Sequence, residues 1–210
     1  MSKTLILWDI DGTLLRTGGA GMVAMRHTCL HLYGPDFQWG EVETAGMLDP
    51  LIFTQLARLN NITVDGQQHR LFHDHYIVEL DRQLNLYPDR LKVMPGVIAL
   101  LRELRRREFR DGEGDLVLGM LTGNYAKVAP IKLRQAGIDV SWFTVAAFGD
   151  DGPTREALMG VALERFKGVT GVEADPARVI VVGDTPRDVA CAHAHQCVAF
   201  AVATGSHSVS

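Results

Sequence analysis

Cysteine is scarce in this chain of 210 residues. It occurs three times, at Cys29, Cys191 and Cys197, and no two cysteines are spaced as a CxxC pair. An odd and sparse set of this kind indicates reduced thiols rather than a disulfide framework. We therefore expect an intracellular, cytoplasmic protein.

A strong charge excess and long apolar runs are also missing. The formal net charge of -4 argues against general nucleic-acid binding. The short apolar stretch near the N-terminus ends at Asp9, so it is neither a signal peptide nor a membrane span. With 47% apolar and 22% charged residues, the composition is that of an ordinary globular protein. It carries no signal for an oligomeric state.

The second half of the chain alternates between apolar runs and helical patterns. Such alternation predicts right-handed βαβ units and a parallel sheet, which is an α/β fold. The predicted strands cover residues 5–7, 116–121, 143–148, 179–182 and 198–202, and the predicted helices between them cover residues 95–107, 125–135, 154–166 and 186–195.

A helical block separates the first strand from this alternating part. Apolar spacing predicts helices over residues 20–33, 50–59 and 65–86, the last with Asp65 as its N-cap. We therefore expect residues 18–90 to form a helical cap domain inserted into an α/β core domain of residues 1–17 and 91–210. The connections at 16–21 and 89–95 are predicted to be the hinges of this cap.

Two aspartates, Asp9 and Asp11, follow the first predicted strand and precede Gly12. Residues two apart on a strand share a face, so the two carboxylates would repel each other, and a divalent cation is the usual remedy. The carboxyl ends of parallel strands are where α/β sheets bind ligands. A polar turn would explain Asp11 and Gly12 but would leave Asp9 unexplained. The pair therefore predicts a functional site.

A second polar group, Thr122-Gly123-Asn124, lies between the strand at 116–121 and the next helix. Free backbone N–H groups at a helix N-terminus favour a phosphate. The alternative is a simple helix cap, which Thr or Asn would also supply.

Acidic and basic residues follow two more strands. Asp184 stands directly after a strand and a glycine, in the position equivalent to Asp9, and Asp188 follows on the first helical turn. Stabilisation of a helix N-terminus would account for Asp188 but not for Asp184. Arg155 begins another helix, where the helix dipole disfavours a cation unless an anion is bound. Together these strand ends supply what a magnesium-dependent phosphoryl-transfer site needs.

The motifs resemble those of the haloacid dehalogenase superfamily, particularly its phosphoglycolate-phosphatase-like and β-phosphoglucomutase-like members. The resemblance covers nearly the whole chain and implies a Rossmann-like parallel core with a small helical cap. It is carried by residues 9–14 (DIDGTL), 122–124 (TGN) and 183–188 (GDTPRD), in that order and spacing.

The resemblance also implies roles for individual residues. Asp9 would be the nucleophile that takes the phosphoryl group, and Asp11 would protonate the leaving alcohol and then activate water. Mg²⁺ would be bound by the Asp9 carboxylate, the Asp11 backbone carbonyl and Asp184. Asp188 would be a further ligand or would support the ligands.

The phosphate would be held by Thr122 and by the backbone N–H groups of Gly123 and Asn124. The family usually places a lysine before its last motif, and this chain has none at that place. Arg155 is our candidate for that function, with Lys127 and Lys132 as alternatives. Arginine presents a planar fork where lysine presents a point charge.

We therefore expect a Mg²⁺-dependent phosphatase that hydrolyses a small phosphorylated metabolite through an aspartyl-phosphate, with neither nucleic acid nor membrane as a partner. The alternatives are a β-phosphoglucomutase-like phosphomutase and a non-catalytic module that binds a phosphate ligand. His69 and His73 share a helix face, which we expect to be solvated rather than metal-binding.

Overall fold

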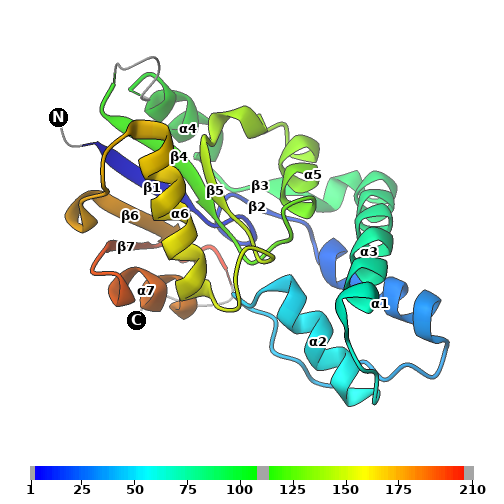
Figure 1. The fold of residues 1–210 in the computed structure, drawn as a ribbon. Coiled ribbons are helices and arrows are strands. Elements are labelled where there is room, and N and C mark those ends of the chain that lie inside the picture. The colour runs from blue at the N-terminus through cyan, green and yellow to red at the C-terminus, as the bar shows by residue number, and fades with distance from the viewer. Residues whose placement is uncertain (1–2, 108–113, 206–210) are drawn as a thin grey trace.

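The computed structural model describes residues 3–107 and 114–205, and its centre is a five-stranded parallel sheet (Figure 1). In spatial order the strands are β5 (Val145–Ala147), β4 (Leu116–Leu121), β1 (Thr4–Trp8), β6 (Val179–Gly183) and β7 (Val198–Ala201). The chain leaves β1 for β4 and β5 on one side and later crosses to β6 and β7 on the other. Ligands bind in open α/β sheets where the strand order reverses in this way.

Four helices cover the two faces of the sheet: α4 (Val97–Arg105), α5 (Val128–Gln135), α6 (Arg155–Thr170) and α7 (Pro186–Ala194). Leu5 and Leu7 of β1 are buried in the cluster that includes residues of α6 and α7. Ile6 and Trp8 are buried in the cluster that includes residues of α4 and α5. Neighbouring residues on a strand face opposite sides, so a strand covered on both sides reads as an unbroken apolar run.

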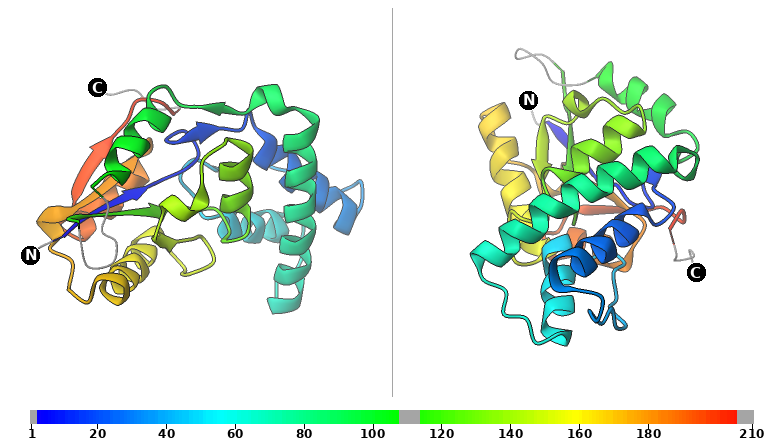
Figure 2. Two further views of the ribbon diagram at one scale, coloured as in Figure 1. Left: turned by 90° about the horizontal axis from the view of Figure 1, so that it is seen from above. Right: turned by 90° about the vertical axis from the view of Figure 1, so that its right-hand side faces the viewer.

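Residues 20–86, which precede α4, form three helices to one side of the sheet (Figures 1 and 2): α1 (Ala20–Tyr33), α2 (Asp49–Leu59) and α3 (Gly66–Leu86). Helices α1 and α3 pack side by side. They bury their own apolar cluster, which Tyr125, Val128 and Ile131 of the core complete. The helical block therefore rests directly on the beginning of α5.

The two connections between the helical block and the sheet lie together. Residues Leu15–Arg16 form β2 and residues Lys92–Val93 form β3, and these pair as a two-stranded antiparallel ribbon. The short 3₁₀ helix η1 (Pro88–Arg90) precedes β3. The two connections are therefore adjacent, which is the arrangement that a single hinge would require.

Several element bounds differ from the predictions. The helix predicted from residue 125 begins at Val128, and the Ala126 N–H before it donates to Asp150 Oδ1 at 2.8 Å. The strand predicted at 143–148 is confined to β5, because residues before it form the 3₁₀ helix η2 (Val140–Trp142). The helix predicted to end at residue 166 continues to Thr170, where Gly171 adopts a left-handed conformation with φ 73° and ends it.

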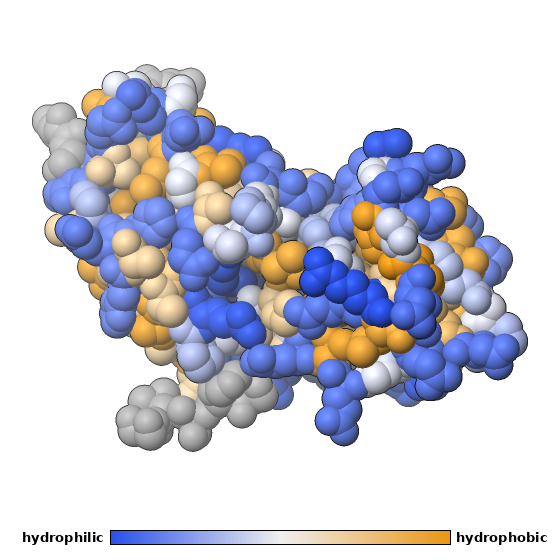
Figure 3. All heavy atoms as spheres, turned by 60° about the horizontal axis from the view of Figure 1, so that its bottom comes forward, coloured by the Kyte–Doolittle hydropathy of each residue, from blue (hydrophilic) through white to orange (hydrophobic). Residues whose placement is uncertain are grey.

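The remaining predicted helices and strands agree with the structure to within two residues at each end. Asp65 caps α3 as predicted, accepting hydrogen bonds from the N–H groups of Gln67 and Gln68, each at 2.8 Å. A short 3₁₀ helix, η3 (Pro176–Arg178), precedes β6. In the part of the chain that the structure describes, no helix has the length and apolar character needed to cross a membrane. On the face shown in Figure 3, hydrophilic residues interrupt the apolar ones.

Candidate active site

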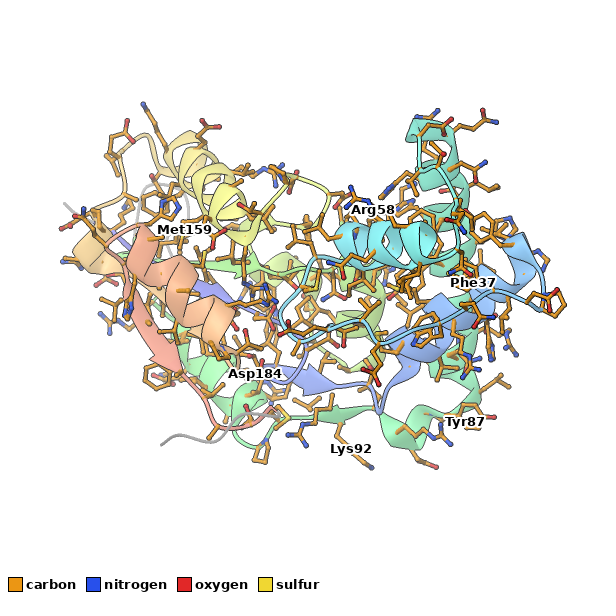
Figure 4. All side chains as sticks on the ribbon, turned by 90° about the horizontal axis from the view of Figure 1, so that it is seen from below. Phe37, Arg58, Tyr87, Lys92, Met159 and Asp184 are labelled. Atoms are coloured by element: carbon orange, nitrogen blue, oxygen red, sulfur yellow. The ribbon has the colours of Figure 1, made fainter. Side chains whose placement is uncertain are left out.

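The predicted site residues come from neighbouring strands of the sheet. Asp9 follows β1, Thr122 follows β4 and Asp184 follows β6, and β1 lies between the other two strands. Their carboxyl ends therefore meet at one edge. Asp184 lies where the sheet faces the helical block, whereas Phe37 and Arg58 belong to that block (Figure 4).

Arg155 joins two of the buried carboxylates. Its guanidinium donates to Asp9 Oδ1 at 3.1 Å, to the Leu121 carbonyl at 3.0 Å and to Asp188 Oδ1. Burial raises the pKa of Asp9 to about 7; the positive charge of Arg155 opposes this shift, and the charges of Asp188 and Asp11 add to it. The structure thus places Arg155, rather than Lys127, beside the predicted nucleophile.

Asp184 lies against the loop that contains the first motif. Its Oδ1 accepts a hydrogen bond from the Thr13 hydroxyl at 3.1 Å. Gly12 has a φ of 85°, and a Cβ at this position would collide with the Asp184 carboxylate. Glycine is therefore required both by the backbone conformation and by the close approach of Asp184. Burial raises the pKa of Asp184 above its usual value.

The carboxylates of Asp9, Asp184 and Asp188 fit a divalent cation. Each offers an oxygen, and these oxygens lie within 4.8 Å of one another. All three residues are buried, so their mutual repulsion is poorly screened by water. An all-oxygen, negatively charged set is what hard cations such as Mg²⁺ prefer.

The two oxygens of Asp188 already have protein partners. Oδ1 accepts from Arg155, and Oδ2 accepts from the Thr185 N–H at 3.0 Å and the Thr185 hydroxyl at 2.6 Å. The second pair of contacts forms a capping box at the start of α7. This bonding favours Asp188 as support for Arg155 and the metal ligands over direct coordination.

The Asp11 side chain points to a different partner. Its Oδ2 accepts from Lys132 Nζ at 2.5 Å and from the Asn124 amide at 2.8 Å. Lys132 also donates to Asn124 Oδ1 at 2.5 Å. Lys132 is 4% exposed, so α5 delivers a buried ammonium group to the predicted acid/base.

The Thr122-Gly123-Asn124 group lies where β4 meets the helical block. Asn124 donates to Thr122 Oγ1 through its side-chain amide, at 2.8 Å, and through its backbone N–H, at 3.3 Å. A Cβ on Gly123 would collide with the Met47 carbonyl. Gly123 and Asn124 line the cavity described next, whereas Thr122 is fully buried beneath them.

A cavity of about 480 Å³ lies between the sheet edge and the helical block. Asp9, Asp11, Arg155 and Asp184 line it from the core, and Gly46, Asp49 and Tyr76 are among the residues that line it from the helical block. Its volume suits a small organic ligand. The site is therefore completed by residues that lie far from the motifs in the sequence.

Asp49 connects the two sides of this cavity. Its backbone N–H donates to the Gly123 carbonyl at 2.8 Å, and its carboxylate accepts from the Tyr125 N–H at 3.3 Å. Burial raises the pKa of Asp49 to about 7; the Lys132 charge opposes the shift, and Asp11 adds to it. The sequence alone does not reveal this contact, because Asp49 also reads as an ordinary first-turn acid.

The position of Lys132 on the buried face of its helix could be read from the sequence. It lies four residues after Val128 on α5, and both side chains are buried. A lysine on the buried stripe of a helix indicates a nearby anion, because an isolated buried charge is costly. The partner is Asp11, not the nucleophile for which Lys132 was considered as a neutralising group.

His69 and His73 of α3 do not form a solvated face, contrary to our expectation. His69 Nε2 lies 2.8 Å from the Tyr125 hydroxyl, and the His73 ring lies 4.8 Å from the Tyr125 ring. The two imidazoles are used in packing the helical block against the core. Lys127 is exposed and does not line the cavity.

Comparisons with known proteins agree with this architecture. The chain is 29% identical over 208 residues to a phosphoglycolate phosphatase of Synechococcus elongatus, covering 95% of this chain and 84% of that one. The structure of CbbY from Rhodobacter sphaeroides in complex with phosphate is similar in fold, with a TM-score of 0.71, 18% identity and coverage of 99% and 90%. A hydrolase from Pseudomonas syringae gives a TM-score of 0.70, 18% identity and coverage of 99% and 88%.

The sequence model of one family, described as haloacid dehalogenase-like hydrolase, matches residues 3–196. This match spans the strands β1, β4, β5 and β6, the helical block and every motif from Asp9 to Asp188. The resemblance inferred from the motifs is confirmed: the chain belongs to the haloacid dehalogenase-like hydrolases and is an enzyme of that family.

Proposed function

We propose that this enzyme is a Mg²⁺-dependent phosphatase that hydrolyses a small phosphorylated metabolite through an aspartyl-phosphate on Asp9. The observation that carries the proposal is the position of the Asp9 carboxylate. It lies at the reversal point of the sheet, 3.1 Å from Arg155 and beside Asp184, and it lines the cavity. A carboxylate that receives a phosphoryl group needs positive charge nearby, because the carboxylate and the phosphate repel each other.

The cation would be held by the carboxylates of Asp9 and Asp184 and by the Asp11 backbone carbonyl. Asp188 would hold Arg155 in place, since its oxygens already bind Arg155 and Thr185. When bound, Mg²⁺ supplies positive charge that offsets the repulsion between the Asp9 carboxylate and an incoming phosphate. Arg155 supplies the same kind of charge from the protein.

In the first step, an Asp9 carboxylate oxygen forms a bond to phosphorus and the bond from phosphorus to the ester oxygen breaks. The Asp11 carboxyl group gives its proton to the departing alkoxide, which leaves as an alcohol. Asp11 faces the cavity and is held by Lys132 and Asn124, so its position is defined before the substrate arrives.

In the second step, the Asp11 carboxylate takes a proton from water as the water oxygen bonds to phosphorus. The bond between phosphorus and Asp9 breaks, inorganic phosphate leaves, and Asp11 is again protonated. The phosphate oxygens would be bound by Arg155 and by the turn at 122–124. This cycle uses one water molecule and returns both aspartates to their starting states.

The substrate class follows from the cavity. At about 480 Å³ it accommodates a small organic phosphate. The relative from Synechococcus elongatus bears the name phosphoglycolate phosphatase, which supports a short phosphate ester as substrate. We also propose that residues 18–90 act as a cap domain, because Gly46, Asp49 and Tyr76 close the cavity over the site.

The test is a panel of phosphorylated metabolites incubated with the enzyme and Mg²⁺, with release of inorganic phosphate as the readout. Asp9→Asn should abolish release while the circular dichroism spectrum stays unchanged. Asp36→Asn, which alters an exposed aspartate of the cap, is the matched control and should retain activity. Phosphate release by Asp9→Asn at the wild-type rate would overturn the proposal.

The same panel separates the alternatives. A phosphomutase would convert one sugar phosphate into its isomer without net phosphate release. A binding module would turn over none of the compounds yet would bind one of them in calorimetry.

A further inference from the structure

We propose that the cap carries a second metal site, a three-histidine site for a transition-metal ion of the Zn²⁺ class, formed by His27 and His31 of α1 with His75 of α3. These residues line a separate pocket of about 180 Å³ on the cap, together with Thr28, Val78 and Glu79. No residue of this pocket lines the cavity that contains Asp9. The proposal is independent of the proposed function.

The pairing of the two helices brings the histidines together. His27 contacts Glu79, and His31 contacts His75. The residue further along α1 thus contacts the residue that comes earlier in α3. The helices are therefore antiparallel here. Residues four apart lie on one helix face. His27 and His31 thus form one such pair, and His75 and Glu79 form the facing pair.

The spacing of the rings suits a shared ion. The His31 and His75 ring centroids lie 5.1 Å apart. Two imidazoles that bind one Zn²⁺ tetrahedrally at its usual Zn–N length have ring centroids about 5 Å apart. In the present side-chain positions the ligand atoms of the three histidines do not all lie within 4.8 Å of one another, so the site forms only after side-chain rotation. The His27 side chain is 46% exposed and its Nδ1 contacts Glu79, so metal binding requires the ring to turn about this contact until Nε2 faces the other two rings.

Glu79 prepares His27 to act as a ligand. The His27 Nδ1 lies 2.8 Å from Glu79 Oε1, and because the ionised carboxylate only accepts, Nδ1 carries the proton. This leaves the Nε2 lone pair free to bind a metal ion. A carboxylate behind a ligating histidine is the usual way to fix its tautomer and orientation. Arg82 holds Glu79 through two hydrogen bonds of 2.7 Å, which fixes the position of the carboxylate behind His27.

The pocket on the cap also contains a buried hydroxyl group that lacks a hydrogen-bond partner. Thr28 lines the pocket and is 2% exposed, and its Oγ1 has no hydrogen-bond partner among the residues that the structure describes. A buried hydroxyl without a partner is costly. A water molecule held by a bound ion would satisfy it and would also fill the fourth position that three histidines leave open.

The test measures binding of Zn²⁺ and Co²⁺ to the full chain without an affinity tag, in excess Mg²⁺ so that the aspartate cluster is occupied. We expect one ion per chain and, for Co²⁺, the visible absorption of a tetrahedral complex. His31→Ala and His75→Ala should each weaken binding by about tenfold or more, and Glu79→Gln by about tenfold. His193→Ala, an exposed histidine of α7, should leave binding unchanged.

Circular dichroism and melting temperature without metal show whether each variant folds. Zn²⁺ should raise the melting temperature of the wild type and of His193→Ala but not that of His31→Ala, because an ion that binds only the folded chain stabilises it. Two results would overturn the proposal: no Zn²⁺ bound in excess Mg²⁺, or Zn²⁺ bound with equal affinity by wild type, His31→Ala and His75→Ala.

Discussion

The Lys132 ammonium group lies 2.5 Å from Asp11 Oδ2, although 121 residues separate the two in the chain. Asn124 binds the same carboxylate oxygen and also accepts from Lys132, so three side chains form a closed set of hydrogen bonds. Lys132 is buried on α5, which gives the ammonium one fixed position. The predicted acid/base is thus oriented by a residue outside the sequence motifs.

Lys132→Met should therefore lower kcat by about 10- to 100-fold with a smaller change in KM, because Asp11 loses the group that orients it. The variant should remain folded, since methionine fits an apolar helix face. Steady-state phosphate release measures the effect. Lys127→Met, at an exposed position on the turn before α5, is the control and should behave as wild type. Equal kinetics for both variants would remove Lys132 from the site.

Arg155→Lys tests whether the planar fork is needed. One guanidinium nitrogen of Arg155 reaches Asp9, the Leu121 carbonyl and Asp188. A lysine keeps the charge and a nitrogen donor but loses the rigid planar group that fixes the position of that nitrogen. We expect a loss of activity of about tenfold or more with a modest loss of stability.

Arg155→Met should be more severe, because it leaves Asp9 and Asp188 buried without their cation. Breaking such a buried pair costs about 3–5 kcal/mol. Urea unfolding at pH 7 measures this loss. If Arg155→Met were as stable as wild type at that pH, the ion pairs with Asp9 and Asp188 would contribute nothing to the fold.

Asp49 gives a prediction about pH. Its pKa is raised by burial to about 7 in the folded chain, against an unfolded value near 4. The folded chain therefore binds the Asp49 proton more tightly than the unfolded chain. This contribution to stability is fully present below the unfolded pKa and is lost as the pH rises through about 7.

Asp49→Asn removes this dependence and keeps an acceptor for the Tyr125 N–H. Relative to wild type, the variant should gain stability between pH 4 and pH 8, by about 2 kcal/mol at pH 8, since the cavity leaves Asp49 partly solvated. Urea unfolding at both pH values gives the difference. A difference between the two proteins that is the same at pH 4 and pH 8 would show that Asp49 is already ionised at low pH in the folded chain.

The core of the fold and its strand-end residues could be predicted from the sequence, because apolar periodicity reports burial directly. Asp9, Asp184 and Arg155 were identified as residues that follow strands, and parallel strands bring their carboxyl ends to one edge. The structure places all three at that edge, and Arg155 lies against Asp9.

The cap side of the site could not be predicted in the same way. Asp49 and Tyr76 approach the cavity through packing of the cap helices against the core, which no local spacing encodes. The same holds for His69 and His73. Their spacing describes one helix face, but only the position of Tyr125 shows that this face is covered by the core.

The contacts of the cap predict how the enzyme closes. The Asp49 N–H bonds to the Gly123 carbonyl, and Met47 packs against Gly123, so the turn proposed to bind phosphate also holds the cap. The two connections pair as β2 and β3, and Gly18 and Gly19 beside them have positive φ angles of 60° and 87°. A bound phosphate analogue would fix this turn and favour the closed cap.

With Mg²⁺ and orthovanadate, hydrogen exchange should therefore slow at residues 16–21, at 89–95 and at the Asp49 N–H. The exposed loop at 171–175 is the internal control and should exchange at the same rate in both samples. Equal protection of both connections with and without the analogue would count against a moving cap.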